Sequence, residues 1–335
     1  MQNEKSHTFT PEPFRPAPWL PGPHGQTIAG RLLRRPGMPR FERVRLDTPD
    51  GDFVDLDFPP APNQNAPLVL LLHGLEGSAR RAYAVNTYVE LARRGIAAVG
   101  LNFRSCSGEP NRLPRFYHSG DTDDIRHVIA YLTKRYPGRK FGVIGYSLGG
   151  NALLKYLGEE GEAAARVVSA AVAVSVPYDL GAGADLLSSN FMGRFYTNIF
   201  IRSLVEKTEQ KKHLLNGRYD EARLKSARSF RAFDDAVTAV LHGFDGADDY
   251  YRKSSSAQFV EHIRVPALLI HAEDDPFVPA GSFPHGALRT NPYVQAAITP
   301  SGGHVGFVEG TPLEPRFWAE RQAARFLATV LCGQS

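Results

Sequence analysis

The stretch Gly145-Tyr146-Ser147-Leu148-Gly149 decides how this chain is interpreted. It follows a short apolar run at residues 140–144 and precedes a helix-like run at residues 151–157. Strand, tight turn and helix, with a glycine two residues on either side of a serine, form the pattern of a nucleophile elbow. The turn is too sharp for side chains at the glycine positions and strains the serine backbone. Taken alone, the pattern is also compatible with an ordinary Ser/Gly turn. The rest of the sequence must therefore distinguish a nucleophile elbow from such a turn.

Composition narrows the classes of protein. The 335 residues are 42% hydrophobic and 22% charged, which is typical of a globular α/β protein with a sizeable core. The net charge of +4 comes from scattered basic residues without interleaved aromatics, so we predict no nucleic-acid partner. Weak contact with an anionic membrane surface is compatible with that charge, but we favour an ordinary solvated basic face.

Location is predicted from the cysteines and the apolar runs. Cys106 and Cys332 cannot form a disulfide framework, which favours a reducing compartment. Residues 1–10 carry no apolar signal core, and no apolar run is long enough for a transmembrane helix. We therefore expect a cytoplasmic protein without a transmembrane segment.

An alternation of strands and helices begins at residue 68. Strands are predicted at 68–72, 96–103, 141–144, 167–176, 267–271 and 294–298, with helices at 83–94, 121–136 and 147–157 and a closing helix at 315–331. This order predicts a mostly parallel sheet with helices on both faces. A helix is predicted at 29–35, and a hairpin over residues 41–58 adds antiparallel strands at one edge of the sheet. Residues 177–260 form a helical insertion, or cap, after the sixth strand. Residues 1–22 are an N-terminal extension, and residues 23–335 form the main domain.

A nucleophilic serine needs a histidine base and an acid that orients the histidine. In hydrolases built on a nucleophile elbow, the acid and then the histidine follow the serine along the chain. Asp275 is the favoured acid, with Asp274 as the alternative. His304 is the favoured base because it lies in a glycine-rich loop after the last predicted strand of the alternation. His271 and His285 are the alternatives, and both lie closer to Asp275 along the sequence.

The oxyanion of an acyl-transfer reaction needs two backbone N–H donors. We expect one from Leu148, after the nucleophile, and one from Leu75, in the loop after the first buried strand. His73 in that loop is either a second catalytic histidine or a structural brace, and we favour the brace. Asp121, Asp123 and Asp124 suggest a metal site or the start of a helix, and we favour the helix.

Seven motifs, one of which contains the stretch at 145–149, make the chain resemble the YheT-like branch of the α/β-hydrolase superfamily, which includes ABHD-type ester and lipid hydrolases. They are HGQTIAGRLLRR (24–35), HGLEGS (73–78), NFRSCSGEPNR (102–112), YHSGDTDD (117–124), GYSLGGN (145–151), HAEDDPFVP (271–279) and GGHVGF (302–307). One departure is Ser105, where the resemblance leads us to expect glycine. If its loop approaches the substrate, the extra side chain narrows the pocket.

The resemblance implies an α/β-hydrolase fold with Ser147 as nucleophile, Asp275 as acid and His304 as base. It also implies hydrolysis of acyl esters or acylglycerol-type lipids, with a small-molecule ester or lipid as substrate. No cofactor and no metal are expected. Phe191, Phe195, Tyr196, Ile199 and Phe200 in the insertion form either an acyl-chain wall or ordinary core. Two other functions remain open: acyl transfer to an alcohol, and a non-catalytic binding module on a hydrolase scaffold.

Overall fold

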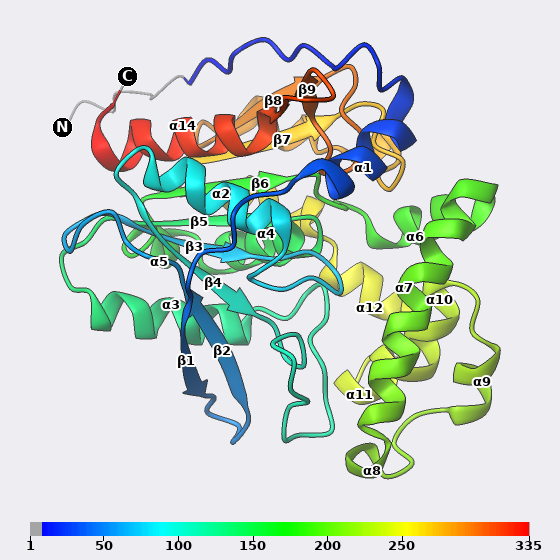
Figure 1. Ribbon diagram of the computed structural model, residues 1–335. Coiled ribbons are helices and arrows are strands. Elements are labelled where there is room, and N and C mark those ends of the chain that lie inside the picture. Colours follow the sequence, from blue (N-terminus) through cyan, green and yellow to red (C-terminus); the bar gives the residue numbers. More distant parts are fainter. Residues whose placement is uncertain (1–8, 335) are drawn as a thin grey trace.

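The computed structural model describes residues 9–334, and residues 1–8 of the expected N-terminal extension lie outside this range, as does residue 335. An eight-stranded sheet has the order β1-β2-β4-β3-β5-β6-β7-β8 (Figure 1). Its strands are β1 (Glu42–Asp47), β2 (Phe53–Phe58), β3 (Leu68–Leu72), β4 (Ala97–Asn102), β5 (Phe141–Tyr146), β6 (Ala170–Val174), β7 (Ala267–Ala272) and β8 (Val294–Thr299). Strands β3 to β8 run parallel, and the β1–β2 hairpin joins β4 antiparallel. The predicted sheet and its antiparallel edge are confirmed.

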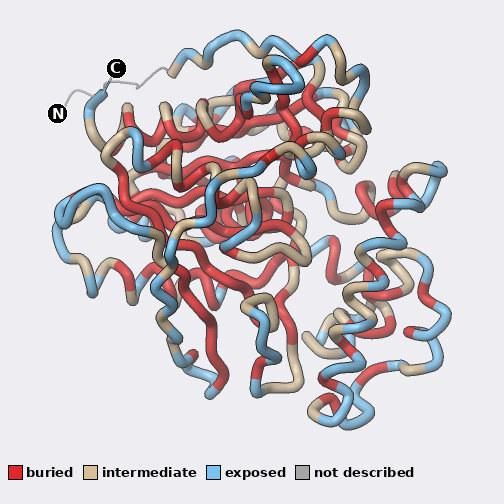
Figure 2. Tube along the Cα trace, viewed as in Figure 1, coloured by how far each residue is buried: buried red, intermediate tan, exposed pale blue. Residues whose placement is uncertain are grey.

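Helices cover both faces of the sheet, which explains why its central strands are apolar throughout. Leu68, Leu70 and Leu72 of β3 pack toward α3 (Asp123–Arg135) and α4 (Leu148–Glu160). Val69 and Leu71 pack toward α2 (Ala82–Ala92) and α14 (Trp318–Cys332) on the other face. The strands accordingly form a buried layer in Figure 2. Burial on both faces removes the alternation of polar and apolar residues.

Two segments are built differently from the sequence expectation. The closing helix was expected from residue 315, but residues 315–317 form β10 (Pro315–Phe317), which pairs antiparallel with β9 (Val308–Gly310). Before the sheet, α1 (Gly22–Leu33) begins seven residues earlier than the helix expected at residue 29. Ahead of α1, Phe14 packs its ring against Trp318 of α14 with centroids 5.6 Å apart.

The segment between β6 and β7 is helical, and in Figure 1 it forms a group of helices beside the sheet. It contains α6 (Leu180–Ser189), α7 (Phe191–Gln210), α8 (Lys212–Leu215), α9 (Glu221–Ser226), α10 (Phe230–Phe233), a π-helical turn (Asp234–Thr238), α11 (Ala239–His242) and α12 (Ala247–Ser254). These helices share a small apolar core that includes Ile201, Leu215 and Val237. Phe116, from the connection between β4 and α3, packs into the same core. Short helical elements complete the fold: α5 (Glu162–Ala165), a 3₁₀ turn at Ser256–His262, another at Ala280–Ser282, and α13 (His285–Thr290).

Candidate active site

Ser147 stands on the sharp turn between β5 and α4. Its backbone has φ 52° and ψ −119°, a left-handed conformation that costs energy for a residue with a side chain. A Cβ on Gly145 would lie 2.4 Å from the Gly149 carbonyl oxygen, and one on Gly149 would lie 2.5 Å from the Leu72 carbonyl oxygen. Both glycines are therefore required by close backbone approach. The turn places the serine at the N-terminal end of α4.

The structure brings Ser147, His304 and Asp275 into one hydrogen-bonded chain. His304 Nε2 lies 2.9 Å from Ser147 Oγ, and His304 Nδ1 lies 2.9 Å and 3.1 Å from the two carboxylate oxygens of Asp275. A carboxylate only accepts, so Nδ1 carries the proton and Nε2 accepts from the serine hydroxyl. The Asp275 side chain is fully buried, and that of His304 is 13% exposed. The site can therefore take a proton from Ser147 and stabilise the resulting imidazolium.

The two neighbouring aspartates have different partners. Asp275 accepts from the Phe277 N–H at 2.8 Å while it faces His304. Asp274 instead accepts from the Gly303 N–H at 2.8 Å, and so holds the loop that carries His304. The geometry favours Asp275 over Asp274 as the partner of the histidine.

The alternative histidines are occupied elsewhere. His271 stacks against Phe283 with ring centroids 4.8 Å apart, and His285 packs on the same ring at 4.9 Å. His73 accepts from the Phe103 N–H at 3.1 Å through Nε2, so its Nδ1 donates to the Gly74 carbonyl at 2.7 Å. Burial lowers the pKa of His73 to about 4, which keeps the ring neutral. Its contacts are those of a brace for the loop after β3.

That loop lies against the nucleophile, as the expected oxyanion hole requires. A Cβ on Gly74 would lie 3.3 Å from Ser147 Cβ and 3.8 Å from Oγ. Leu75 and Leu148 line the same cavity. Glu76 fastens the loop to the insertion, because its carboxylate accepts from Lys207 Nζ of α7 at 2.7 Å. The two leucine N–H groups remain the predicted oxyanion donors.

The loop that carries His304 is held from α1, a role that the sequence did not reveal. The His304 N–H donates to Thr27 Oγ1 at 2.9 Å. Buried Gln26 exchanges two hydrogen bonds with Val308, donating at 3.2 Å and accepting at 2.7 Å. Buried Arg34 donates to the Val305 carbonyl at 2.7 Å. All three residues belong to the motif at 24–35. The motif therefore pointed to residues near the site, but the sequence did not show that they hold the His304 loop.

A cavity of about 80 Å³ opens beside Leu75 and Leu148 and extends beneath the insertion. Its apolar lining comes from Phe116 and Tyr117 of the sheet connection and from the insertion residues Leu204, Phe230, Phe233 and Val237. Polar groups also border it, among them Glu76, Lys207, His118, Asp234 and His242. The arrangement is a mainly apolar cavity beside Leu148, the residue that follows Ser147.

The expectation that five residues of α7 form either an acyl-chain wall or ordinary core is wrong for three of them, which do neither. Phe191, Phe195 and Ile199 are 78%, 46% and 42% exposed, and none of the five borders the cavity. Their spacing of four residues places them on one face of α7, and their exposure shows that this is its outer face. Buried Tyr196 turns inward and packs on Phe277, which stacks on His304 with ring centroids 4.3 Å apart.

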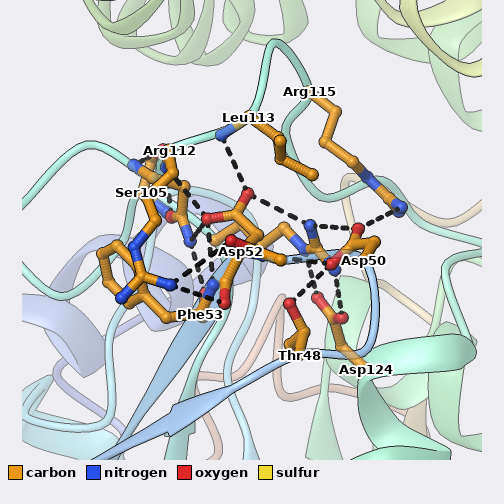
Figure 3. A network of polar contacts seen from close by, with 12 residues as sticks. Thr48, Asp50, Asp52, Phe53, Ser105, Arg112, Leu113, Arg115 and Asp124 are labelled. Atoms are coloured by element: carbon orange, nitrogen blue, oxygen red, sulfur yellow. Dashed lines mark hydrogen bonds and ion pairs between the residues drawn. The ribbon is translucent and has the colours of Figure 1, made fainter.

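The stretch at residues 102–124 holds a buried polar network (Figure 3). Arg104 donates to Asp124 at 2.6 and 2.7 Å and to Asp52 at 3.1 Å. Burial alone would raise the pKa of Asp52, but hydrogen bonds from Asn111 and from backbone N–H groups lower it below the ordinary value. The network ties the β1–β2 hairpin to the start of α3 and supplies no group to the Ser147 site.

Two of the acidic side chains at 121–124 form ion pairs with arginines. Asp121 pairs with Arg115 at 2.7 Å, and Asp123 pairs with Arg126 at 2.7 Å. Within residues 9–334, no cluster of three or more His, Cys, Asp or Glu side chains is placed to hold a metal. The run opens α3 as expected, with Asp123 and Asp124 in the first turn, but Thr122 occupies the N-cap position without a side-chain cap bond.

Ser105 does not narrow the cavity. Its φ of 61° lies in the left-handed region, which accounts for the glycine expected there. Its hydroxyl accepts from the Asn111 N–H at 3.2 Å, and the residue lies outside the cavity lining. The serine is therefore part of the polar network.

The comparisons with known proteins agree with this fold. Residues 67–311 match the family model described as alpha/beta hydrolase fold. YheT of Escherichia coli (strain K12) is 39% identical over 316 residues, which cover 93% of this chain and 92% of YheT. A monoacylglycerol lipase of Saccharomyces cerevisiae is 34% identical over 268 residues, covering 78% of this chain and 59% of that protein.

Two further comparisons concern a human relative and a solved structure. Human phospholipase ABHD3 is 28% identical over 327 residues, covering 96% of this chain and 80% of that protein. The solved Pyrococcus furiosus esterase Pf2001 has the same fold, with a TM-score of 0.57 and 17% identity over 97% of this chain and 99% of that one. From the family model and the YheT match together, the chain is a member of the α/β-hydrolase fold family, in the branch that contains YheT.

Proposed function

We propose that this chain is a serine carboxylic-ester hydrolase in which Ser147, His304 and Asp275 act as nucleophile, base and acid. Ester hydrolysis as a class is supported by relatives named as lipases and by an esterase of the same fold. The observation that carries the residue roles is the continuous hydrogen-bonded chain from Ser147 Oγ through His304 to buried Asp275.

In the proposed reaction, Ser147 Oγ attacks the ester carbonyl carbon as its proton passes to His304 Nε2. Asp275 holds the ring by its Nδ1–H and stabilises the imidazolium. The N–H groups of Leu75 and Leu148 take the oxyanion, and each such donor stabilises the transition state by about 3 kcal/mol. His304 then protonates the departing alcohol, which leaves an acyl-enzyme. Water that gives its proton to His304 attacks this ester, and His304 returns the proton to Ser147 Oγ as the acid is released.

The cavity beneath the insertion is the proposed acyl site. It adjoins both predicted oxyanion donors, and its lining is largely aromatic and aliphatic. An acyl chain placed there removes apolar surface from water, at about 0.8 kcal/mol for each buried CH₂. Acylglycerol-type lipids and simple acyl esters both present such a chain.

The proposal is tested by hydrolysis of p-nitrophenyl butyrate by purified Ser147→Ala protein. We expect kcat to fall by at least about 10⁴-fold, because the nucleophile is lost, while circular dichroism is unchanged. Ser189→Ala, an exposed serine on α6, is the matched control and should retain full activity. Retained turnover in the folded Ser147→Ala protein would rule the proposal out.

A further inference from the structure

The exposed apolar side chains are concentrated at one place. Among residues 9–334, ten large apolar side chains are exposed, and six of them lie on α1, the loop after it, and α7. These six are Ile28, Leu32, Met38, Phe191, Phe195 and Ile199. Leu32, Met38 and Phe191 are each more than 60% exposed, at 63%, 63% and 78%. Such a concentration on a monomer is typical of an interaction site.

The two helices meet, so their exposed residues belong to one surface. His24 Nδ1 of α1 lies 3.1 Å from the Tyr196 hydroxyl of α7, and their ring centroids are 5.7 Å apart. Ile28 follows His24 by four residues and Leu32 follows by eight, so all three share one side of α1. Phe195 directly precedes Tyr196, and its ring contacts the tyrosine ring at 5.8 Å.

The same surface carries positive charge. Residues 21–40 and 186–205 contain six arginines and no aspartate or glutamate, although the chain has 35 acidic residues among 335. Arg34 is buried against Glu320. Arg31, Arg35, Arg40, Arg194 and Arg202 are exposed and form no ion pair with any described residue. We call the exposed apolar residues and exposed arginines of α1 and α7, together with Arg35 just after α1, the α1–α7 surface.

The α1–α7 surface adjoins the candidate active site. Tyr196 packs on Phe277 at 4.8 Å, and Phe277 stacks on His304 at 4.3 Å. Thr27, one residue before Ile28, bonds the His304 backbone. Whatever covers this surface therefore lies next to the residues that contact His304.

We propose that the α1–α7 surface docks on an anionic lipid bilayer. Exposed aromatic and aliphatic side chains enter the headgroup region, while neighbouring arginines contact anionic headgroups. A second copy of the chain fits the surface poorly, because a two-fold interface would set these arginines against each other. The proposal goes beyond ester hydrolysis, since binding to the bilayer requires no chemistry at Ser147.

The test is co-sedimentation with vesicles, carried out in the Ser147→Ala background so that no lipid is cleaved. We expect binding to phosphatidylcholine vesicles that contain about 30% phosphatidylglycerol, and much weaker binding to phosphatidylcholine alone or at high salt. Phe191→Ser/Phe195→Ser should weaken binding about 10-fold or more. Arg31→Glu/Arg35→Glu should weaken it about 20-fold or more, since each reverses a favourable charge.

Matched controls keep the change in hydropathy and charge but move it away from the surface. Val167→Ser/Val240→Ser removes two other exposed apolar side chains, and Arg218→Glu/Arg289→Glu makes the same change in net charge. Both controls should bind as tightly as the parent protein. Absence of binding by the parent, or equal losses in variants and controls, would overturn the proposal. A dimer in sedimentation velocity that Phe191→Ser/Phe195→Ser abolishes, without vesicle binding, would instead assign the surface to a second copy.

Discussion

The hydroxyl of Thr27 accepts a hydrogen bond of 2.9 Å from the backbone N–H of His304, across 277 positions of the sequence. The same hydroxyl donates to the Pro23 carbonyl at 2.7 Å, which fixes its direction. Thr27 thus holds the histidine loop in place without facing the histidine ring. It is a positioning residue for the proposed base.

Thr27→Val should lower kcat for p-nitrophenyl butyrate about 10-fold or more, because the His304 N–H loses its acceptor. KM should change little, since Thr27 is absent from the cavity lining. Thr27→Ser keeps the hydroxyl and should restore most of kcat. Equal losses in the valine and serine variants would assign Thr27 a packing role only.

Asp275→Asn should lower kcat about 10³- to 10⁴-fold, because an amide at this position favours the wrong histidine tautomer. Asp274→Asn is the matched control. Its side-chain oxygen can still accept from Gly303, so we expect a loss of less than about 10-fold. Steady-state kinetics of both purified variants decides between the two acids. A larger loss for Asp274→Asn would reverse their assignment.

Leu204→Phe should shorten the acyl cavity, since Leu204 lines it from α7. We expect kcat/KM for p-nitrophenyl octanoate to fall about 10-fold relative to that for the acetate, as an overfilled pocket excludes methylene groups. Val240→Phe, at an exposed position on α11, should leave the ratio unchanged. An unchanged ratio in Leu204→Phe would place the acyl chain elsewhere.

Two neighbouring histidines should make the fold sensitive to acid. Burial, with repulsion from Arg115, lowers the pKa of His118 to about 3, and burial, with repulsion from His118, lowers the pKa of His242 to about 2. Both stay neutral in the fold, whereas an unfolded histidine takes up a proton near pH 6.5. The unfolded chain therefore binds more protons below that pH, and the free energy of unfolding falls as the solution is acidified.

His242→Phe removes one of these titrating groups and keeps an aromatic ring at that position. Between pH 7 and pH 4.5, its free energy of unfolding should fall by about 2 kcal/mol less than that of the parent protein. Urea denaturation at both pH values measures the difference. His262→Phe, at an exposed histidine, should follow the parent. Identical pH dependence in all three proteins would contradict the role of burial.

The sequence predicted those features that depend on local pattern and chain order. The apolar run 68–72 indicated a strand covered on both faces, and the structure buries alternate residues against different helices. The elbow could be predicted because Gly145 and Gly149 leave no space for a Cβ. The choice of Asp275 and His304 rested on their order after Ser147, and the structure places the three side chains in contact.

The features that were missed depend on contacts between distant segments. The motif at 24–35 has no chemistry of its own, and only the fold shows that Gln26, Thr27 and Arg34 hold the His304 loop. The aromatic residues of α7 were assigned to a wall or a core because their spacing cannot tell an inner helix face from an outer one. Pairing of β9 with β10 escaped prediction because strands of three residues carry too little pattern.

The central claim is that Ser147 forms the covalent acyl intermediate. Its most direct test is labelling with a fluorophosphonate, followed by intact mass and peptide mapping. We predict one adduct per chain, located on Ser147. The adduct should form at the same rate as the activity toward p-nitrophenyl butyrate is lost. Asp275→Asn should slow labelling, and Ser147→Ala should not be labelled. An adduct on another residue, or full labelling of the folded Ser147→Ala protein, would contradict the account.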